Sequence, residues 1–237
     1  MNDIAFVTWT NTECEDVFPL YFGQFDKYCN DYKSYVIINE NSSEIPERHQ
    51  QLVNAEDDPF YKRFIGCLEQ IEEKYVIYMQ EDHILYDELQ KDKLSELFEY
   101  MKDSDYSCLR LIKSGEMGGE QVAENIFEIP ATSGFLLSQQ TAIWLKEDLI
   151  KLFNYFKPIT FRDVEQYGSF AFSSSRLKCC YYYNNEEKRG NLHFDSSVVP
   201  YVATAINKRK WNLSEYRNEL LPLLEKYGID YTQRGEC

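Results

Sequence analysis

The stretch "YVIYMQEDHILYDEL", residues 75–89, holds the clearest strand pattern of this chain together with its sharpest group of polar residues. Its first five residues are apolar or aromatic, which is typical of a strand buried on both faces that ends at Gln80. Glu81, Asp82 and His83 follow at once, and apolar residues resume after them. Ligands of α/β sheets bind beyond the carboxyl ends of parallel strands, so these side chains indicate a site there. The alternative is a solvated acidic turn that caps the next helix.

The residues on either side of this stretch alternate between strand and helix patterns. We expect strands at 4–9 and 35–38, and helices at 16–29, from Pro59 onward, and at 88–101. The polar stretch 41–58 is expected to be a loop. The order strand, helix, strand, helix, strand, helix predicts an α/β sheet wound in parallel.

The second half of the chain is less regular. We expect short strands at 107–112, 126–129, 134–137 and 180–183, and helices at 141–156, 163–172 and 214–227. Ser214 is expected to cap the last helix, and Gly228 to end it. The sequence has no internal repeat and no low-complexity linker, so we predict a single domain over residues 1–237.

Composition limits the classes of partner and compartment. The net charge is −15, from 40 acidic and 25 basic residues, which argues against a nucleic acid polymer as partner but not against a nucleotide. Seven scattered cysteines without a CxxC motif indicate buried, reduced thiols in a cytosolic protein. The start, MNDIAFVTWT, lacks the features of a signal peptide, and no stretch approaches the roughly 20 apolar residues that span a bilayer. We therefore expect a cytoplasmic protein, which could still work beside a membrane.

The acidic pair Glu81–Asp82 is the strongest chemical signal. Mg²⁺ and Mn²⁺ prefer oxygen ligands, often one or two carboxylates with substrate phosphates. His193, in "GNLHFDSS", could add an imidazole nitrogen to such a site, although a lone histidine is more often a packing residue. His83 is a competing ligand, while His49 lies in a polar stretch and is expected to be solvated.

The stretch "FRDVEQYGSF", residues 161–170, offers a candidate general base. Asp163 or Glu165 could take a proton from an attacking hydroxyl. Two residues apart on a helix, they cannot both face the same way, so at most one is expected to be the base. The alternative is a carboxylate that only stabilises a helix N-terminus.

Basic residues offer two further candidate sites. Lys62 and Arg63 precede the acidic pair on a predicted helix and could reach a phosphate. The run Lys208, Arg209 and Lys210 could clamp a diphosphate or anchor the protein to an anionic lipid, and thus to a membrane surface. A solvated basic turn is the usual explanation for such a run. The sequence contains no GxSxG, Walker A, GxGxxG or HExxH motif.

The sequence resembles GT-A-type glycosyltransferases, which act on nucleotide sugars. The likeness is carried by residues 4–10, Asn39–Glu40, the acidic pair after "YVIYMQ", "ATSGFLLS", "RDVEQY" and "HFDSSVVPYVATAINKRKWN". It covers the whole chain and implies a Rossmann-like mixed sheet flanked by helices. Residues 1–105 would bind the nucleotide sugar, and residues 106–237 would bind the acceptor. The family's acidic motif is usually Asp-x-Asp, and Glu81-Asp82-His83 departs from it at the last position.

The resemblance also implies roles for individual residues. Asp82 would bind Mn²⁺ or Mg²⁺ with help from Glu81, and His193 would be a late metal ligand. The donor would contact Thr8, Thr10, Asn39, Glu40 and Arg63. Asp163 or Glu165 would deprotonate the acceptor, and the loop near 132–134 would face the acceptor sugar.

The function predicted from these features is metal-dependent glycosyl transfer. A sugar would move from a nucleoside-diphosphate donor to a hydroxyl of a glycan or lipid-linked acceptor, with inversion, in the synthesis of a surface polysaccharide. One alternative is a nucleotidyltransferase or a phosphohydrolase that uses the same crevice. The other is a sugar- or nucleotide-binding module without catalysis, which the incomplete Asp-x-Asp motif favours.

Overall fold

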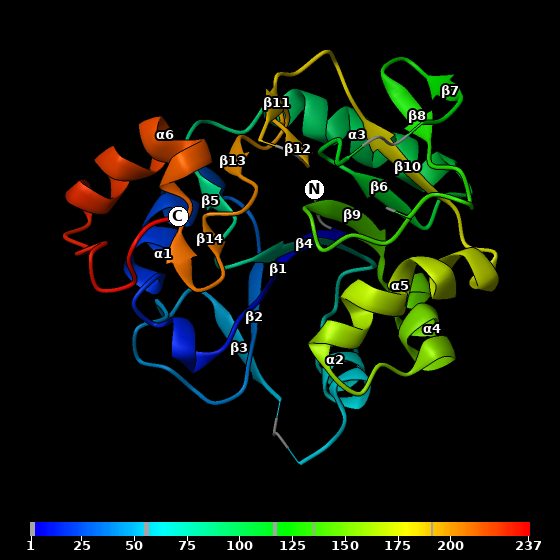
Figure 1. Cartoon of the computed structure of the whole chain (residues 1–237). Helices are drawn as coiled ribbons and strands as arrows, with labels where there is room; N and C mark the ends of the chain where they lie inside the picture. The colour runs from blue at the N-terminus through cyan, green and yellow to red at the C-terminus, as the bar shows by residue number, and fades with distance from the viewer. Residues whose placement is uncertain (1–2, 55–56, 116–117, 135, 191) are drawn as a thin grey trace.

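The computed structural model describes residues 3–54, 57–115, 118–134, 136–190 and 192–237, with the side chain of Glu165 left out. Over these residues the chain forms a large mixed sheet with helices on both faces (Figure 1). The predicted fold class is therefore confirmed: an α/β domain with a Rossmann-like mixed sheet flanked by helices.

Nine strands of the described residues make up the main sheet, in the order β3-β2-β1-β4-β9-β6-β10-β8-β7. Their bounds are β1 Ile4–Trp9, β2 Ser34–Ile38, β3 Gln50–Val53, β4 Tyr75–Gln80, β6 Cys108–Arg110, β7 Gln121–Ala123, β8 Ile126–Glu128, β9 Ala142–Leu145 and β10 Cys179–Tyr182. The first four in chain order, β1 to β4, pair in parallel, so their carboxyl ends meet at one edge. The quoted stretch therefore forms an inner strand, as predicted.

The sheet stops being parallel at β9. This strand lies between β4 and β6 and runs antiparallel to both. The helix predicted at 141–156 is wrong for its first part, because α4 begins only at Lys146 and ends at Phe156. Ala142, Ile143 and Trp144 are buried and form an apolar run without a polar face. Such a run is compatible with either a buried helix or an inner strand, so its periodicity could not distinguish the two.

Helices cover the two faces of the sheet in two groups. On one face lie α1 (Phe18–Cys29), α3 (Lys91–Asp103) and α6 (Leu213–Lys226); on the other lie α2 (Phe60–Leu68), α4 and α5 (Phe161–Ser175). Alternate residues of β1 serve the two groups, since Phe6 packs with the first and Val7 with the second. Burial on both faces explains why the strand sequences read as continuous apolar runs.

Short strand pairs join distant parts of the chain beside the main sheet. β5 (Ile84–Leu85) pairs antiparallel with β13 (Tyr201–Val202). The other pairs are β11 (Lys188–Arg189) with β12 (His193–Phe194), and β14 (Ile206–Asn207) with β15 (Lys210–Trp211). A 3₁₀ turn, η1 (Thr12–Cys14), follows β1. The β5–β13 pair brings the late segment of the chain next to the acidic turn that follows β4.

Three local predictions are corrected. The stretch 41–58 contains β3 and is not only a loop. Gly134, Leu136 and Leu137 lie in turns and not in a strand, while Phe135 is outside the described residues. The N-cap of α6 is Asn212 instead of Ser214, whereas Gly228 follows the helix with a positive φ of 66°, as its predicted role requires.

His49 is buried and not solvated as predicted. Its Nδ1 lies 2.8 Å from Ser34 Oγ, and its Nε2 lies 3.0 Å from Asp26 Oδ1. Burial lowers the pKa of His49 below its ordinary value, and the Asp26 carboxylate opposes part of this decrease. The ring joins the β3 segment to α1, because it packs against Phe22 and Phe25.

We expect His49 to make the protein less stable in mild acid. Because its pKa is lower in the folded state, the unfolded chain binds more protons as pH falls below the unfolded value near 6.5. Stability is therefore lost as pH decreases from that value through the folded pKa. Melting temperatures between neutral and mildly acidic pH should fall more steeply for the wild type than for His49→Gln. Equal slopes would contradict this role.

No helix among the described residues is both long and apolar enough to cross a membrane. All seven cysteines lie within the described residues and are free thiols. Five are buried as predicted, whereas Cys14 is partly exposed and Cys237 is exposed.

Candidate functional site

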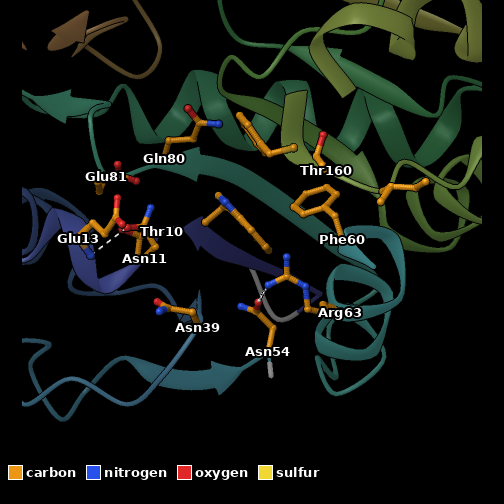
Figure 2. Close-up of a pocket in the computed structure, with 13 residues that line it drawn as sticks. Thr10, Asn11, Glu13, Asn39, Asn54, Phe60, Arg63, Gln80, Glu81 and Thr160 are labelled. Atoms are coloured by element: carbon orange, nitrogen blue, oxygen red, sulfur yellow. Dashed lines mark hydrogen bonds between the residues drawn. The ribbon is translucent and has the colours of Figure 1, made fainter. Parts of the chain in front are cut away.

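A pocket of about 430 Å³ opens at the carboxyl ends of β1, β2, β3 and β4. Its lining residues are Trp9, Thr10, Asn11, Glu13, Asn39, Asn54, Phe60, Arg63, Gln80, Glu81, Ile159, Thr160 and Phe161. Figure 2 shows the side chains of Asn39, Asn54 and Arg63 on one side of it, with Glu81 near its opposite end. Three of the predicted donor contacts, Thr10, Asn39 and Arg63, thus share one cavity with Glu81, which is expected to assist the metal ligand.

Glu81 stands at the pocket wall directly after β4. Burial raises the pKa of its carboxyl above the ordinary value, and a hydrogen bond to the Cys14 thiol opposes part of that increase. Cys14 belongs to the 3₁₀ turn η1, which follows β1. The polar ends of two neighbouring parallel strands therefore meet here, as the sequence predicts.

Asp82 points into the protein and not into open water. Its side chain is 15% exposed, and its Oδ1 has no hydrogen-bond partner among the described residues. Burial and then the charge of Glu81 raise the pKa of Asp82, while the backbone N–H of Ile206 lowers it. The Asp82 carbonyl accepts a hydrogen bond from Ala205 N (3.1 Å), so β5–β13 and the segment after it hold this turn in place. This unpartnered Oδ1 is itself buried, and Asp82 is not among the residues that line the pocket.

His83 is fully buried, and its hydrogen bonds fix its tautomer. The N–H of Gln80 donates to His83 Nδ1 (3.3 Å), and Thr141 Oγ1 lies 3.2 Å from the same atom. Burial, with a smaller effect of His193, lowers the pKa of His83 to about 3, so the ring is neutral and Nε2 carries its proton. That Nε2 is 3.9 Å from Asp82 Oδ1. That separation is too long for a hydrogen bond. Because Nδ1 accepts the Gln80 N–H and Nε2 carries the proton, this tautomer of His83 does not fit the role of competing metal ligand.

His193 lies in β12 and reaches the neighbourhood of the acidic turn. Its charge influences His83, and its strand forms a bridge with Ser114. Burial lowers the pKa of His193, and Glu215 opposes part of this decrease. In the described part of the chain, no three His, Cys, Asp or Glu side chains lie grouped so that they could hold a metal ion.

Two predicted donor contacts do not line the pocket. Thr8 is fully buried, and its Oγ1 lies 2.7 Å from Tyr21 Oη on α1. Glu40 is directed to Thr12, whose Oγ1 donates to its carboxylate (3.0 Å). In a strand buried on both faces, Thr8 points to the helix layer, and the period of the strand alone could not show that.

The two predicted bases lie near the start of α5, whose N-cap Thr160 lines the pocket. Asp163 completes a capping box, and its Oδ2 accepts the N–H groups of Ile159 (2.9 Å) and Thr160 (2.8 Å). These hydrogen bonds lower the pKa of Asp163, which makes it a weaker base. Glu165 also belongs to α5, but its side chain lies outside the described residues.

Sequence reasoning missed Asn54, a lining residue that follows β3. Arg63 Nη1 donates to Asn54 Oδ1 (2.8 Å), and Asn54 Nδ2 and Arg63 Nε are buried without a hydrogen-bond partner among the described residues (Figure 2). Because a loop was expected at 41–58, β3 was not predicted, and neither was the polar residue that follows it. An asparagine after the apolar pair Leu52–Val53 was the available signal.

The other basic candidates do not line the pocket. Lys62 pairs with Asp58 (3.2 Å) and does not line the pocket. Lys208 and Arg209 have positive φ values of 51° and 67° and form the turn between β14 and β15. Arg209 is highly exposed, with Glu13 3.9 Å away.

No protein-family model and no curated protein matches this sequence. Solved structures do share its fold. A cytidylyltransferase from Leptospira borgpetersenii superimposes with a TM-score of 0.55 at 11% identity, covering 98% of each chain. CMP:2-keto-3-deoxy-manno-octonic acid synthetase complexed with CTP gives 0.51 at 8% identity, over 76% of this chain and 89% of that one.

S. aureus TarS gives a TM-score of 0.51 at 14% identity, over 96% of this chain. The match covers only 39% of TarS, which is a much longer chain. Identities this low show a common fold and nothing finer.

Proposed function

We propose that this protein is a metal-dependent glycosyltransferase, which moves a sugar from a nucleoside-diphosphate donor to a hydroxyl group of a glycan or lipid-linked acceptor. The observation that carries the proposal is the pocket at the carboxyl ends of β1 to β4, with Glu81, the first residue of the acidic pair, at one end of it. Ten of its thirteen lining residues come from the first 105 residues, which supports the assignment of that half to the donor.

The charge of the pocket favours a diphosphate donor over a triphosphate. Arg63 is its only basic lining residue among those described, whereas Glu13 and Glu81 are acidic. A triphosphate brings more negative charge than one guanidinium can balance, and two carboxylates oppose it. A diphosphate joined to a sugar carries less charge and suits this wall better.

Unpartnered donors on the wall support a ligand rich in acceptor atoms. Asn54 Nδ2 and Arg63 Nε have no partner among the described residues, and a buried donor left unpaired costs about 1–3 kcal/mol. A nucleotide offers phosphate oxygens and base carbonyls that accept from such donors. Trp9 and Phe60, whose rings meet edge to face with centroids 4.8 Å apart, add apolar lining for a base or ribose.

The residues at the acidic turn fit a metal ion that arrives with the nucleotide. Mg²⁺ in nucleotide-dependent enzymes is often held by one or two carboxylates together with substrate phosphates. Glu81 lines the pocket, Asp82 follows it with a buried and unpartnered Oδ1, and His193 is the further candidate ligand. Such an ion supplies positive charge that stabilises a departing diphosphate. This arrangement does not require three protein side chains in one cluster.

Glu165 is the proposed general base. The carboxylate of Asp163 accepts two backbone N–H groups at the start of α5, which makes Asp163 the less suitable of the two candidates. A carboxylate that accepts the proton of the acceptor hydroxyl makes the oxygen a better nucleophile toward the sugar carbon. Attack from the face opposite the diphosphate would invert the configuration at that carbon.

A nucleotidyltransferase is the second candidate, because one structure of the same fold is a cytidylyltransferase by name and another is a synthetase complexed with CTP. The products separate the two functions. We expect the purified protein to release a nucleoside diphosphate from a nucleotide sugar when an acceptor hydroxyl is present. Release of pyrophosphate from a nucleoside triphosphate and a sugar would support the second candidate. A folded sample whose melting temperature no nucleotide changes, with or without Mn²⁺, would contradict both.

We expect Glu165→Gln to slow sugar transfer more than it weakens donor binding. The amide cannot take a proton, so kcat should fall by on the order of a hundredfold, while Kd for the donor changes little. The matched control is Gln166→Ala, which alters the neighbouring exposed position on α5. Equal losses in kcat and donor affinity would point to a structural role for Glu165.

A further inference from the structure

Four large apolar or aromatic side chains are exposed on and beside α5. They are Tyr155, Ile159, Tyr167 and Phe170, here called the aromatic face. Phe170 is 79% exposed and Ile159 68%. The other three large exposed side chains of the described residues, Val53, Val122 and Leu192, are far from these positions in sequence. Grouped exposure of this kind marks an interaction surface more often than scattered exposure does.

The aromatic face is continuous along one flank of α5. Asp163, Tyr167, Phe170 and Ser174 follow each other at spacings of four, three and four residues, which places them on one side of the helix. Ile159 adjoins the N-terminal end of this flank, because its N–H donates to Asp163 Oδ2. At the other end Ser174 Oγ donates to the Phe170 carbonyl (2.9 Å).

A depression of about 330 Å³ lies at the end of the aromatic face that is nearest to the C-terminus of α5. Tyr155 of α4 and Ser174 of α5 both line it, so Tyr155 belongs to the same surface. Arg176 lines it as well, and so does Lys151, which pairs with Asp148 (2.8 Å); no acidic residue is among the described lining residues. The face therefore combines exposed rings with a cationic recess.

The charge around the face differs from that of the rest of the chain. Residues 155–176 contain three basic residues (Lys157, Arg162, Arg176) and two acidic ones (Asp163, Glu165), a net charge of +1. Since the whole chain has −15, the remaining residues have −16. Lys157 and Arg176 are exposed and make no ion pair within the described residues. Charges farther away than the Debye length, about 8 Å at physiological salt, are largely screened from this surface.

We propose that the aromatic face docks the protein onto an anionic lipid surface. Aromatic rings and an isoleucine flanked by lysine and arginine match the boundary of an anionic bilayer. The rings and the isoleucine can insert next to the acyl chains, while the lysine and arginine can bind the anionic headgroups. A second copy of the chain fits less well, since it would bring Lys157 and Arg176 against the same cations. Ile159 also lines the candidate donor pocket, so docking places the rim of that pocket at the membrane. The basic run at Lys208–Lys210 lies on a different part of the molecule, in the β14–β15 turn (Figure 1).

Vesicle sedimentation of the full chain, without nucleotide, tests this docking independently of the proposed enzymatic function. We expect the wild type to bind vesicles that contain phosphatidylglycerol, and not vesicles of phosphatidylcholine alone. The double variant Tyr167→Ser, Phe170→Ser should lower the bound fraction about tenfold, since it removes the inserting rings. Lys157→Gln with Arg176→Gln should reduce binding and its dependence on salt. The control double variant Val53→Ser, Val122→Ser changes exposed apolar residues elsewhere and should bind as the wild type does.

Three results would overturn the proposal. They are no binding to anionic vesicles by the wild type, equal binding by the wild type and the Tyr167/Phe170 variant, and equal binding to both kinds of vesicle. Molar mass measured by light scattering separates membrane docking from self-association. A wild-type dimer that Tyr167→Ser, Phe170→Ser converts to a monomer would identify the aromatic face as an interface between copies.

Discussion

The replacement Asp82→Asn is expected to lower the rate of sugar transfer by on the order of a thousandfold. Asp82 Oδ1 is the unpartnered carboxylate oxygen of the acidic turn, and the charge it would offer to a bound cation disappears in the amide. Rates with a nucleotide-sugar donor, measured across a range of Mn²⁺ concentrations, test this expectation. The fold should survive, because an amide of the same shape is easier to bury than a carboxylate whose pKa burial already raises.

Asp87→Asn is the matched control for this prediction. Asp87 is exposed and lies five residues later, so its replacement removes the same formal charge at a place that does not adjoin the turn. It should leave the rate unchanged. If Asp82→Asn retains most of the transfer activity while remaining folded, the acidic turn does not take part in the reaction.

The replacement Arg63→Gln is expected to weaken nucleotide binding by about ten- to a hundredfold, because a charge-assisted hydrogen bond contributes about 1.5–3 kcal/mol. Arg63 is the only basic residue among the described residues that line the pocket, and Asn54 holds its guanidinium in place. Isothermal titration with nucleoside diphosphates measures the effect directly.

Lys62→Gln serves as its control on the same helix. Lys62 is exposed and pairs with Asp58, outside the pocket, so the loss of its charge tests general electrostatic attraction alone. Equal losses of affinity in both variants would mean that overall charge, and not the Arg63–Asn54 pair, governs binding.

Most of the first half of the fold follows from its sequence. Strands such as Ile4–Trp9 and Tyr75–Gln80 are apolar throughout and end in polar residues, so both the element and the edge that carries the pocket are visible. β9 was not recognisable, because "AIWL" has no period and runs directly into a helical pattern. β3 was hidden for the opposite reason, since its residues at the sheet edge are polar and partly exposed. Only the partners of these strands in the sheet decide their structure.

The candidate site was predictable to the extent that strand ends determine it. Thr10, Asn39 and Glu81 follow buried strands, and the structure brings all three to one pocket. The side chains of Thr8 and Glu40 could not be placed in this way, because their hydrogen bonds to Tyr21 and Thr12 depend on how α1 and η1 pack. The position of Asn54 at a strand end could not be predicted, because the sequence of β3 does not show a strand pattern.

The pairing of β5 with β13 has a consequence for how the chain folds. The turn that holds Asp82 receives backbone hydrogen bonds from Ala205 and from the pairing of Ile84 with Val202, more than a hundred positions later in the chain. Loop-closure entropy makes contacts of such high contact order slow to form. During synthesis on a ribosome, the acidic turn therefore cannot form its backbone hydrogen bonds until residues 202–205 have been made. Strands β1 to β4 are synthesised much earlier, so they can pair before the turn that holds Asp82 is complete.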